Sequence, residues 1–264
     1  MISLVEYVVD PGTCWYGNLA LLGNLMREVK EAGATAIKPQ FWPASVYKGH
    51  PMEKQALLCE LNKNLIEGIV SLATFHKLEL WFSVFGLREF KLLEDRFPEA
   101  LRTVKIAESQ NHNFKLITRA MHSEHVGRVL ISLSSYNAYI DVFLDDEMRY
   151  DRPGFSPKAL YCCPKYPAET KDVRFPRAIK GEGDFNDRWF GFSDHTRDSL
   201  AAVAAVTMGA KMIEKHVRPI PVTYKLVSDG YLRPYPDSVC DVNSHEFGLM
   251  VEKCEDVRRM IEWS

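Results

Sequence analysis

The stretch GFSDHTRDSLAAVAAVTMGAKMIEKHV (residues 191–217) decides the fold, because it reads as one strand, one helix and a second strand. Apolar runs at residues 189–192 and 210–213 predict the strands. The small-residue run between them, residues 198–208, predicts a helix that stops at Gly209. This spacing is typical of one repeat of a parallel α/β fold.

His195 and His216 follow these two strands at equivalent positions, 21 residues apart. If the strands are parallel neighbours, both imidazoles lie at the same end of the sheet, about 5 Å apart. A single histidine there is more often a hydrogen-bonded scaffold residue than a ligand. The pair, with Asp194 and Glu214 beside it, favours a divalent metal at the carboxyl ends of the strands.

The composition is that of an ordinary globular protein. With 264 residues, 46% hydrophobic residues and a net charge of −2, the chain suits one large α/β barrel or two small domains. No run reaches the ~18 apolar residues of a membrane helix, and Met1 leads directly into a strand-like run, so we expect a cytoplasmic protein with no membrane partner. The six cysteines lack paired spacing and are expected to be reduced. The absence of a dense basic stretch excludes a nucleic-acid partner.

Strand-like and helical patterns alternate along the whole chain. Strands are expected at residues 4–9, 35–40, 78–84, 103–107, 126–133, 159–163, 189–192 and 210–213. Helices are expected at residues 18–32, 52–76, 87–95, 114–121, 198–208 and 244–262. Eight β/α units without a dividing linker predict a single (β/α)8 TIM barrel over residues 1–264. Residues 135–150, read as strand or loop, and residues 164–188, read as a weak helix, fit this alternation poorly.

Six runs of the chain resemble the sialic acid synthase family (N-acetylneuraminate synthase-like), in the same order and at similar spacings. They are EAGATAIKPQ (31–40), TVKIAES (103–109), CCPKYPAETKDVRF (162–175), GFSDHT (191–196), GAKMIEKH (209–216) and PDSVCDVNSHEF (236–247). The resemblance implies a (β/α)8 barrel with one divalent metal, manganese or magnesium first, with zinc or iron as alternatives. It also implies condensation of phosphoenolpyruvate with an N-acetylated amino-sugar aldehyde to give a nine-carbon 2-keto sugar acid.

The resemblance assigns the metal to His195 and His216. It places Asp237 close to the metal and the sugar, although an aspartate after a proline also suits a turn. It matches Glu6 to an acidic residue that ends the first strand. In the family this residue orients or deprotonates the attacking water. The loop that follows the strand is lengthened around residues 10–13. An ion pair between Glu6 and Lys38 is the alternative role.

Lys38 and Lys105 match two lysines that bind phosphoenolpyruvate, and both follow apolar runs. A buried ammonium group needs an anionic substrate or a carboxylate such as Glu6 or Glu108. We expect both lysines to face one anionic site at the barrel mouth together with Ser193. The further residues matched to the substrate site are Gln40, Glu108, Ser132 and, near the sugar, Tyr166.

Three positions depart from the family pattern where phosphoenolpyruvate would lie. Glu108 replaces an anion-binding serine, Val84 replaces a threonine and Pro164 replaces an asparagine. A slip of one residue would return Ser109 to the position of the serine. A carboxylate in an anion site repels phosphate, so we expect phosphoenolpyruvate to bind more weakly than a carboxylate without phosphate.

The resemblance also implies a homodimer in which a small C-terminal antifreeze-like domain lends an arginine to the sugar site of the partner subunit. From residues 1–264 we expect a protein without that domain, in which residues 219–236 are a possible lid or replacement. Three functions stay open. They are a divergent synthase acting on small anionic and sugar-like molecules, a metal-dependent lyase or isomerase of a non-phosphorylated carbonyl compound, and a catalytically silent homologue.

Overall fold

The computed structural model describes residues 5–49, 53–135, 138, 157–175, 189–219 and 241–262. Its strands form one sheet in which every pairing is parallel. They are β1 (Glu6–Asp10), β2 (Ala36–Ile37), β3 (Gln40–Phe41), β4 (Glu79–Leu80), β5 (Phe82–Val84), β6 (Thr103–Ile106), β7 (Arg128–Leu133), β8 (Lys158–Cys162), β9 (Trp189–Asp194), β10 (Met212–Arg218) and β11 (Val242–Asn243).

The sheet closes on itself as a barrel. β2 and β3 together act as one interrupted strand of the barrel, and β4 and β5 act as the next one. β2 pairs with β4, and β3 pairs with β5. β1 pairs with β10 on one side and with β2 on the other, which completes a ring of eight strands. The predicted (β/α)8 barrel is therefore confirmed, and β11 adds a short extension beside β10.

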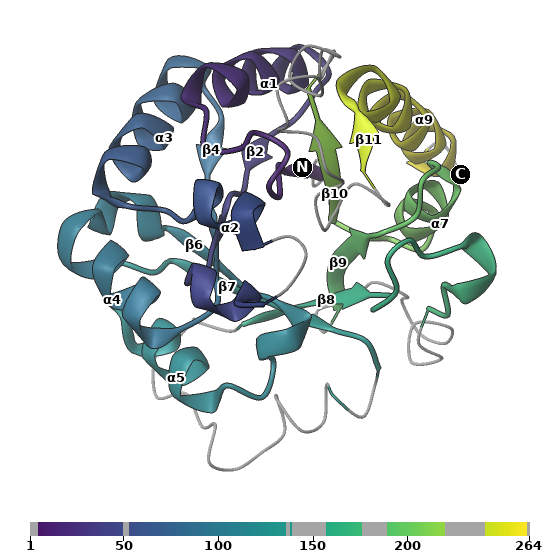
Figure 1. Ribbon diagram of the computed structural model, residues 1–264. Coiled ribbons are helices and arrows are strands. Elements are labelled where there is room, and N and C mark those ends of the chain that lie inside the picture. The colour runs from purple at the N-terminus through teal and green to yellow at the C-terminus, as the bar shows by residue number, and fades with distance from the viewer. Residues whose placement is uncertain are drawn as a thin grey trace.

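Helices form the outer layer around this ring (Figure 1). They are α1 (Leu19–Glu31), α2 (Glu53–Cys59), α3 (Lys63–Phe75), α4 (Leu87–Arg96), α5 (Phe114–His122), α7 (Leu200–Thr207) and α9 (Ser244–Glu262). The predicted continuous helix over residues 52–76 is wrong, because α2 ends at Cys59 and Asn62 starts α3 as an N-cap whose side chain accepts from Leu65 N. None of the described helices combines the length and hydropathy needed to span a bilayer.

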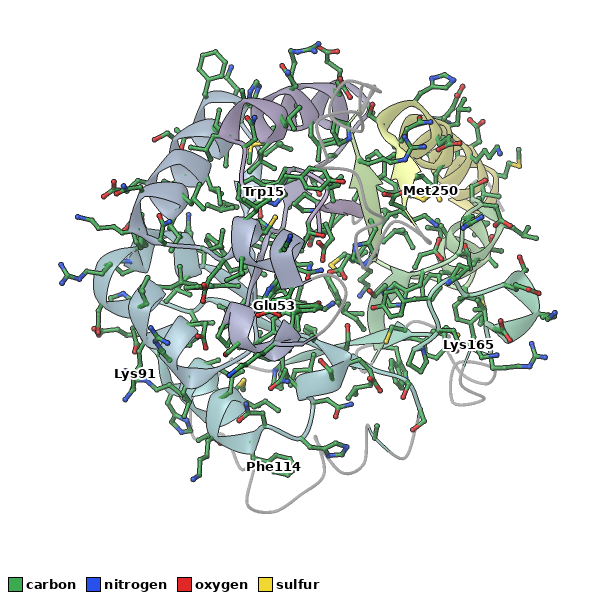
Figure 2. The ribbon with its side chains drawn as sticks, in the orientation of Figure 1. Trp15, Glu53, Lys91, Phe114, Lys165 and Met250 are labelled. Atoms are coloured by element: carbon green, nitrogen blue, oxygen red, sulfur yellow. The ribbon has the colours of Figure 1, made fainter. Side chains whose placement is uncertain are left out.

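Two apolar layers lie on the two faces of the barrel wall. The larger layer packs between strands and helices, whereas polar side chains such as Lys91 point outward (Figure 2). The smaller layer fills the inside of the barrel with Val8, Ala36, Trp81, Leu130, Leu160 and Met212. Because a strand repeats every two residues, the side chains two positions further along face the same interior. They are Asp10, Lys38, Ser83, Ser132, Cys162 and Glu214, so the interior changes from apolar to polar toward the carboxyl ends of the strands.

Some predictions fall on parts of the chain outside the described residues. They include most of residues 135–150 and 164–188, all but the first of residues 219–236, and Asp237. The cysteines of the described part, Cys14, Cys59, Cys162, Cys163 and Cys254, form no disulfide, in agreement with the predicted reduced state.

Candidate active site

A cavity of about 310 Å³ opens at the carboxyl ends of the barrel strands. It collects eight of the side chains that the sequence singles out, namely Gln40, Lys105, Glu108, Ser132, Tyr166, Ser193, His195 and His216. Lys38 lies in the barrel interior but is fully buried and does not line the cavity. Asp237 lies outside the described residues.

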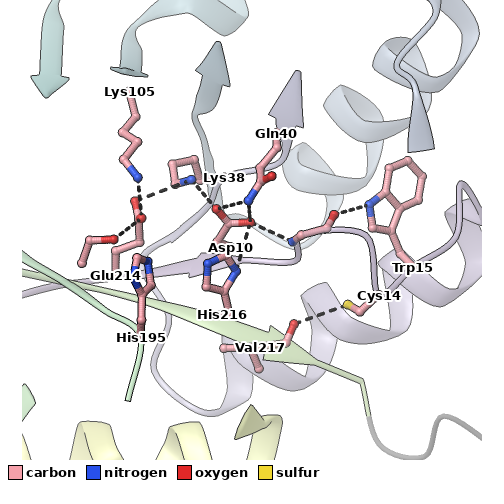
Figure 3. Close-up of polar contacts among 12 residues, drawn as sticks. Asp10, Cys14, Trp15, Lys38, Gln40, Lys105, His195, Glu214, His216 and Val217 are labelled. Atoms are coloured by element: carbon pink, nitrogen blue, oxygen red, sulfur yellow. Dashed lines mark hydrogen bonds and ion pairs between the residues drawn. The ribbon is translucent and has the colours of Figure 1, made fainter. Parts of the chain in front are cut away.

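Four charged side chains form a buried quartet, which we define as Asp10, Lys38, Lys105 and Glu214. Lys38 Nζ lies 2.5 Å from Asp10 Oδ2 and 3.6 Å from Glu214 Oε2, and Lys105 Nζ lies 2.9 Å from Glu214 Oε1. Figure 3 shows Lys38 and Gln40 directed at Asp10, and Lys105 directed at Glu214. Ser193 Oγ donates to Glu214 Oε1 at 2.8 Å. The quartet is neutral, so neither lysine contributes an uncompensated charge.

The ion pairs outweigh the effect of burial on the pKa values of the quartet. Burial alone would raise the pKa of Glu214, but Lys105 and then Lys38 lower it to about 2. Burial would also raise the pKa of Asp10, but Lys38 and His216 hold it well below its usual range. Both carboxyl groups are therefore ionised at neutral pH.

Asp10 connects the quartet to the histidines and to the loop after β1. Its Oδ1 accepts from Gly12 N at 2.7 Å and lies 3.7 Å from His216 Nδ1, and Gln40 Nε2 donates to both its oxygens at 3.1 and 3.0 Å. These contacts fix the carboxylate between Lys38 and His216.

His195 and His216 lie side by side, as predicted from their spacing. Asp194 of β9 is opposite Lys215 of β10, so the two histidines are the next register neighbours, with ring centroids 5.6 Å apart. His216 lies within β10 rather than after it, because β10 extends to Arg218.

The tautomer of His195 follows from its contacts. Nδ1 lies 2.8 Å from the Cys163 carbonyl, which can only accept, so Nδ1 carries the hydrogen. Nε2 then carries the lone pair and accepts a hydrogen bond from the Tyr166 hydroxyl at 3.1 Å. Burial, and then His216, lower the pKa of His195 to about 3, so the ring is neutral.

His195 and His216 are suitable ligands for a divalent metal. A metal-binding imidazole is neutral and donates its second nitrogen to a carbonyl or carboxylate, as His195 does to Cys163. Among the described residues, no group of three or more His, Cys, Asp or Glu side chains forms a ligand set. The two imidazoles would therefore need water, substrate or Asp237 to complete a coordination shell.

The stability of the metal-free protein is expected to fall below pH 6.5 because of His195. The unfolded chain protonates this histidine near pH 6.5, whereas the folded protein keeps it neutral to about pH 3. The contribution of neutral His195 to the free energy of unfolding is fully present above pH 6.5. Below that pH the free energy of unfolding decreases by at most about 1.4 kcal/mol per pH unit. Urea unfolding in EDTA at pH 7, 6 and 5 should show a shallower decrease for His195→Gln than for wild type. His112→Gln, on the exposed surface, is the control. Parallel curves for wild type and His195→Gln would contradict this assignment.

Glu6 lies at the opposite end of the barrel from the predicted position. It begins β1 rather than ending it. Its carboxylate accepts hydrogen bonds from Arg128 Nη1 at 2.7 Å and from Arg128 Nη2 at 2.9 Å. The Arg128 guanidinium also stacks over Trp81 at 4.5 Å. Both Glu6 and Arg128 start their strands, so this pair lies at the amino end of the barrel, opposite the cavity. Asp10 is the acidic residue that ends β1, and it pairs with Lys38. The predicted loop around residues 10–13 therefore starts one residue later, because Asp10 belongs to the strand.

Two carboxylates of the site have roles that the sequence pattern does not predict. The pattern places Asp10 in a loop, and it places Glu214 only beside the histidines. The signal was present in the strand alternation, because Asp10 follows the inward-facing Val8 by two residues and Glu214 follows Met212 by two.

The three departures from the family pattern have different positions. Glu108 lines the cavity and accepts from Ser134 Oγ at 2.9 Å, and Ser109 lines the cavity beside it. Pro164 also lines the cavity. Val84 is buried in the layer between strands and helices, so this substitution removes no donor from the cavity, contrary to expectation.

Known proteins resemble both the sequence and the fold. The chain is 30% identical over 205 residues to a pseudaminic acid synthase from Helicobacter pylori, covering 76% of this chain and 51% of that protein. It is 23% identical to an N,N'-diacetyllegionaminic acid synthase from Legionella pneumophila, covering 96% and 72%. The crystal structure of an N-acetylneuraminic acid synthetase from Leptospira borgpetersenii, in complex with citrate, superposes with a TM-score of 0.78 at 21% identity, covering 98% and 85%.

The chain thus spans about half the length of the Helicobacter protein. The model of the NeuB family matches residues 25–263, which is most of the sequence and includes both histidines of the cavity. This protein therefore belongs to the NeuB family.

Proposed function

We propose that this protein is a metal-dependent synthase that joins an enolpyruvyl or pyruvate-like donor, phosphoenolpyruvate or a related compound, to a sugar aldehyde and forms a 2-keto sugar acid. The observation that carries the proposal is the cavity that combines two adjacent imidazoles with Lys105 and buried hydroxyl groups. Membership of the NeuB family and the names of the similar synthases support it.

The donor carboxylate would bind at Lys105 and Ser132. Lys105 lines the cavity and uses one N–H for Glu214, which leaves donors for a ligand. Ser132 Oγ is buried and has no hydrogen-bond partner among the described residues, which is costly unless a ligand supplies one. Both side chains face the same cavity from neighbouring strands, β6 and β7.

The aldehyde would bind on the histidine side of the cavity. The proposed ligands of the divalent cation, manganese or magnesium first, are His195 and His216, with Asp237 as a further candidate. When bound, such a cation polarises a carbonyl oxygen. Tyr166 is half exposed, and its hydroxyl lies 3.1 Å from His195 Nε2, so it is placed to contact a sugar that enters the mouth. Asp10, held by Lys38 and Gln40, would orient His216.

The buried quartet argues against a catalytically silent homologue. Burying four charges is costly, and a well-packed apolar interior is often as stable or more stable. The quartet holds Lys105 and Asp10 in the wall of the cavity, so a role in chemistry there accounts for this costly arrangement.

The proposed function is tested by mass spectrometry of reaction products. The protein is incubated with manganese, one donor and a panel of aldoses that includes N-acetylated amino sugars. Phosphoenolpyruvate should give a product with the mass of donor, aldehyde and water less phosphate, and pyruvate one with the summed mass. Absence of any such product with either donor, in protein shown to contain metal, would refute the proposal.

Lys105→Gln is expected to weaken donor binding by roughly 10- to 150-fold, because a charge-assisted hydrogen bond contributes about 1.5–3 kcal/mol. Calorimetry with pyruvate and with phosphoenolpyruvate measures the change. Lys115→Gln, at an exposed position of α5, is the matched control. Unchanged affinity for both donors in Lys105→Gln would remove Lys105 from the donor site.

A further inference from the structure

The cavity contains one carboxylate that the quartet does not neutralise. Glu108 is half-buried, lines the cavity and accepts a hydrogen bond from Ser134 Oγ at 2.9 Å. Within the part of the chain that the structure describes, Glu108 forms no ion pair. Lys105, which lines the same cavity, is already paired with Glu214 at 2.9 Å. Glu108 therefore adds a negative charge, without an ion-pair partner among the described residues, to the cavity where a donor would bind.

We infer that the donor selected by this cavity is a monoanionic 2-oxo acid of the pyruvate type rather than a phosphorylated enol, and that Glu108 makes the selection. The inference rests on the proposed function and names its donor. The quartet is neutral, so among the described residues of the cavity a divalent cation and Glu108 would together leave one positive charge. One carboxylate balances that charge, whereas phosphoenolpyruvate adds a phosphate as well.

The apolar part of the cavity lining suits a methyl group better than a phosphate. Phe85, Ala107 and Pro164 line the cavity and offer no side-chain donor, and Pro164 also lacks a backbone N–H. A pyruvate carboxylate on Lys105 and Ser132 would leave its methyl group among these residues. A phosphate among these three residues would gain no side-chain donor from them.

The expected difference in affinity between pyruvate and phosphoenolpyruvate follows from electrostatic repulsion by Glu108. Two like unit charges about 4 Å apart at an effective dielectric constant near 20 reduce affinity by roughly a thousandfold. Glu108 is partly exposed, so screening reduces this effect to about 10- to 100-fold.

The corresponding reaction is an aldol addition in which no atom is lost. The Glu108 carboxylate takes a proton from C3 of the donor, and the C–H electron pair forms the C2–C3 double bond of an enolate. C3 then attacks the aldehyde carbon, the new C–C bond forms, and the aldehyde oxygen recovers the proton from Glu108. The product is a 4-hydroxy-2-oxo acid, and the reaction needs no oxidant or reductant.

Two measurements on the manganese-loaded protein test this inference. The first is calorimetry with pyruvate and with phosphoenolpyruvate, on wild type, Glu108→Gln and the control Glu99→Gln, whose residue is exposed near the opposite end of β6. The second is proton NMR in D2O, which follows exchange of the pyruvate methyl protons. We expect wild type to prefer pyruvate, and Glu108→Gln to bind phosphoenolpyruvate about 10- to 100-fold more tightly with little change for pyruvate. Methyl exchange should be present in wild type and Glu99→Gln and lost in Glu108→Gln.

The outcomes separate this inference from the proposed function. Low-micromolar binding of phosphoenolpyruvate to wild type, with no improvement in Glu108→Gln, would overturn the inference and leave a synthase that uses the phosphorylated donor. Preserved methyl exchange in Glu108→Gln would overturn the role of Glu108 as the base. Failure of wild type to bind either donor would refute the proposed function itself.

Discussion

Asp10→Asn is expected to lower the free energy of unfolding by about 3–5 kcal/mol, because it leaves the fully buried Lys38 ammonium without its nearest carboxylate. Glu214 remains 3.6 Å from Lys38 but is already engaged by Lys105 and Ser193. The asparagine keeps the size of the side chain and an oxygen acceptor for Gly12 N, so the change isolates the charge. Urea denaturation at pH 7 measures the loss.

Two further variants control this measurement. Asp95→Asn, on the exposed surface of α4, removes the same charge and should change the stability by less than about 0.5 kcal/mol. The double variant Asp10→Asn, Lys38→Met removes both partners and should recover part of the loss. A loss below about 1 kcal/mol in Asp10→Asn would show that the quartet is not charged in the folded protein.

The double variant His195→Ala, His216→Ala is expected to lose its divalent metal, with an affinity more than about a hundredfold below that of wild type. The reason is that it removes both imidazoles of the cavity, which lie 5.6 Å apart. Elemental analysis after dialysis against manganese should find about one metal ion per wild-type chain. The control is His112→Ala, His122→Ala, which removes two exposed histidines. Equal metal content in wild type and the His195, His216 variant would contradict the assignment.

The barrel and the adjacent histidines could be predicted because both depend on local repetition. Apolar runs of strand length are separated by helical patterns, and this alternation leads to few topologies other than a parallel barrel. The 21-residue spacing places His195 and His216 at equivalent points of neighbouring strands. The observed register, with Asp194 opposite Lys215, follows from the same repeat.

The buried quartet could not be predicted, because its partners meet only when the barrel closes. Lys105 and Glu214 are separated by 109 residues, and Lys38 and Asp10 by 28. Asp10 precedes Pro11 and Gly12, and such a run reads as a turn, so the first strand was expected to end one residue early. The acidic residue at the carboxyl end of the first strand was therefore expected to be Glu6 instead of Asp10.

The exchange of Glu6 for Asp10 shows what strand alternation leaves undecided. Glu6, Val8 and Asp10 share one face of β1, so the pattern places both acids inside the barrel. Only the limits of the strand decide which acid reaches the carboxyl end. Arg128, 122 residues away, pairs with Glu6 at the other end.

Crystals soaked with manganese and pyruvate, measured by anomalous X-ray diffraction, test the central claim most directly. The account predicts one anomalous peak within bonding distance of His195 and His216, and a carboxylate bound to Lys105 and Ser132 in the same cavity. A cation bound elsewhere, or a cavity in which neither ligand is found, would contradict it.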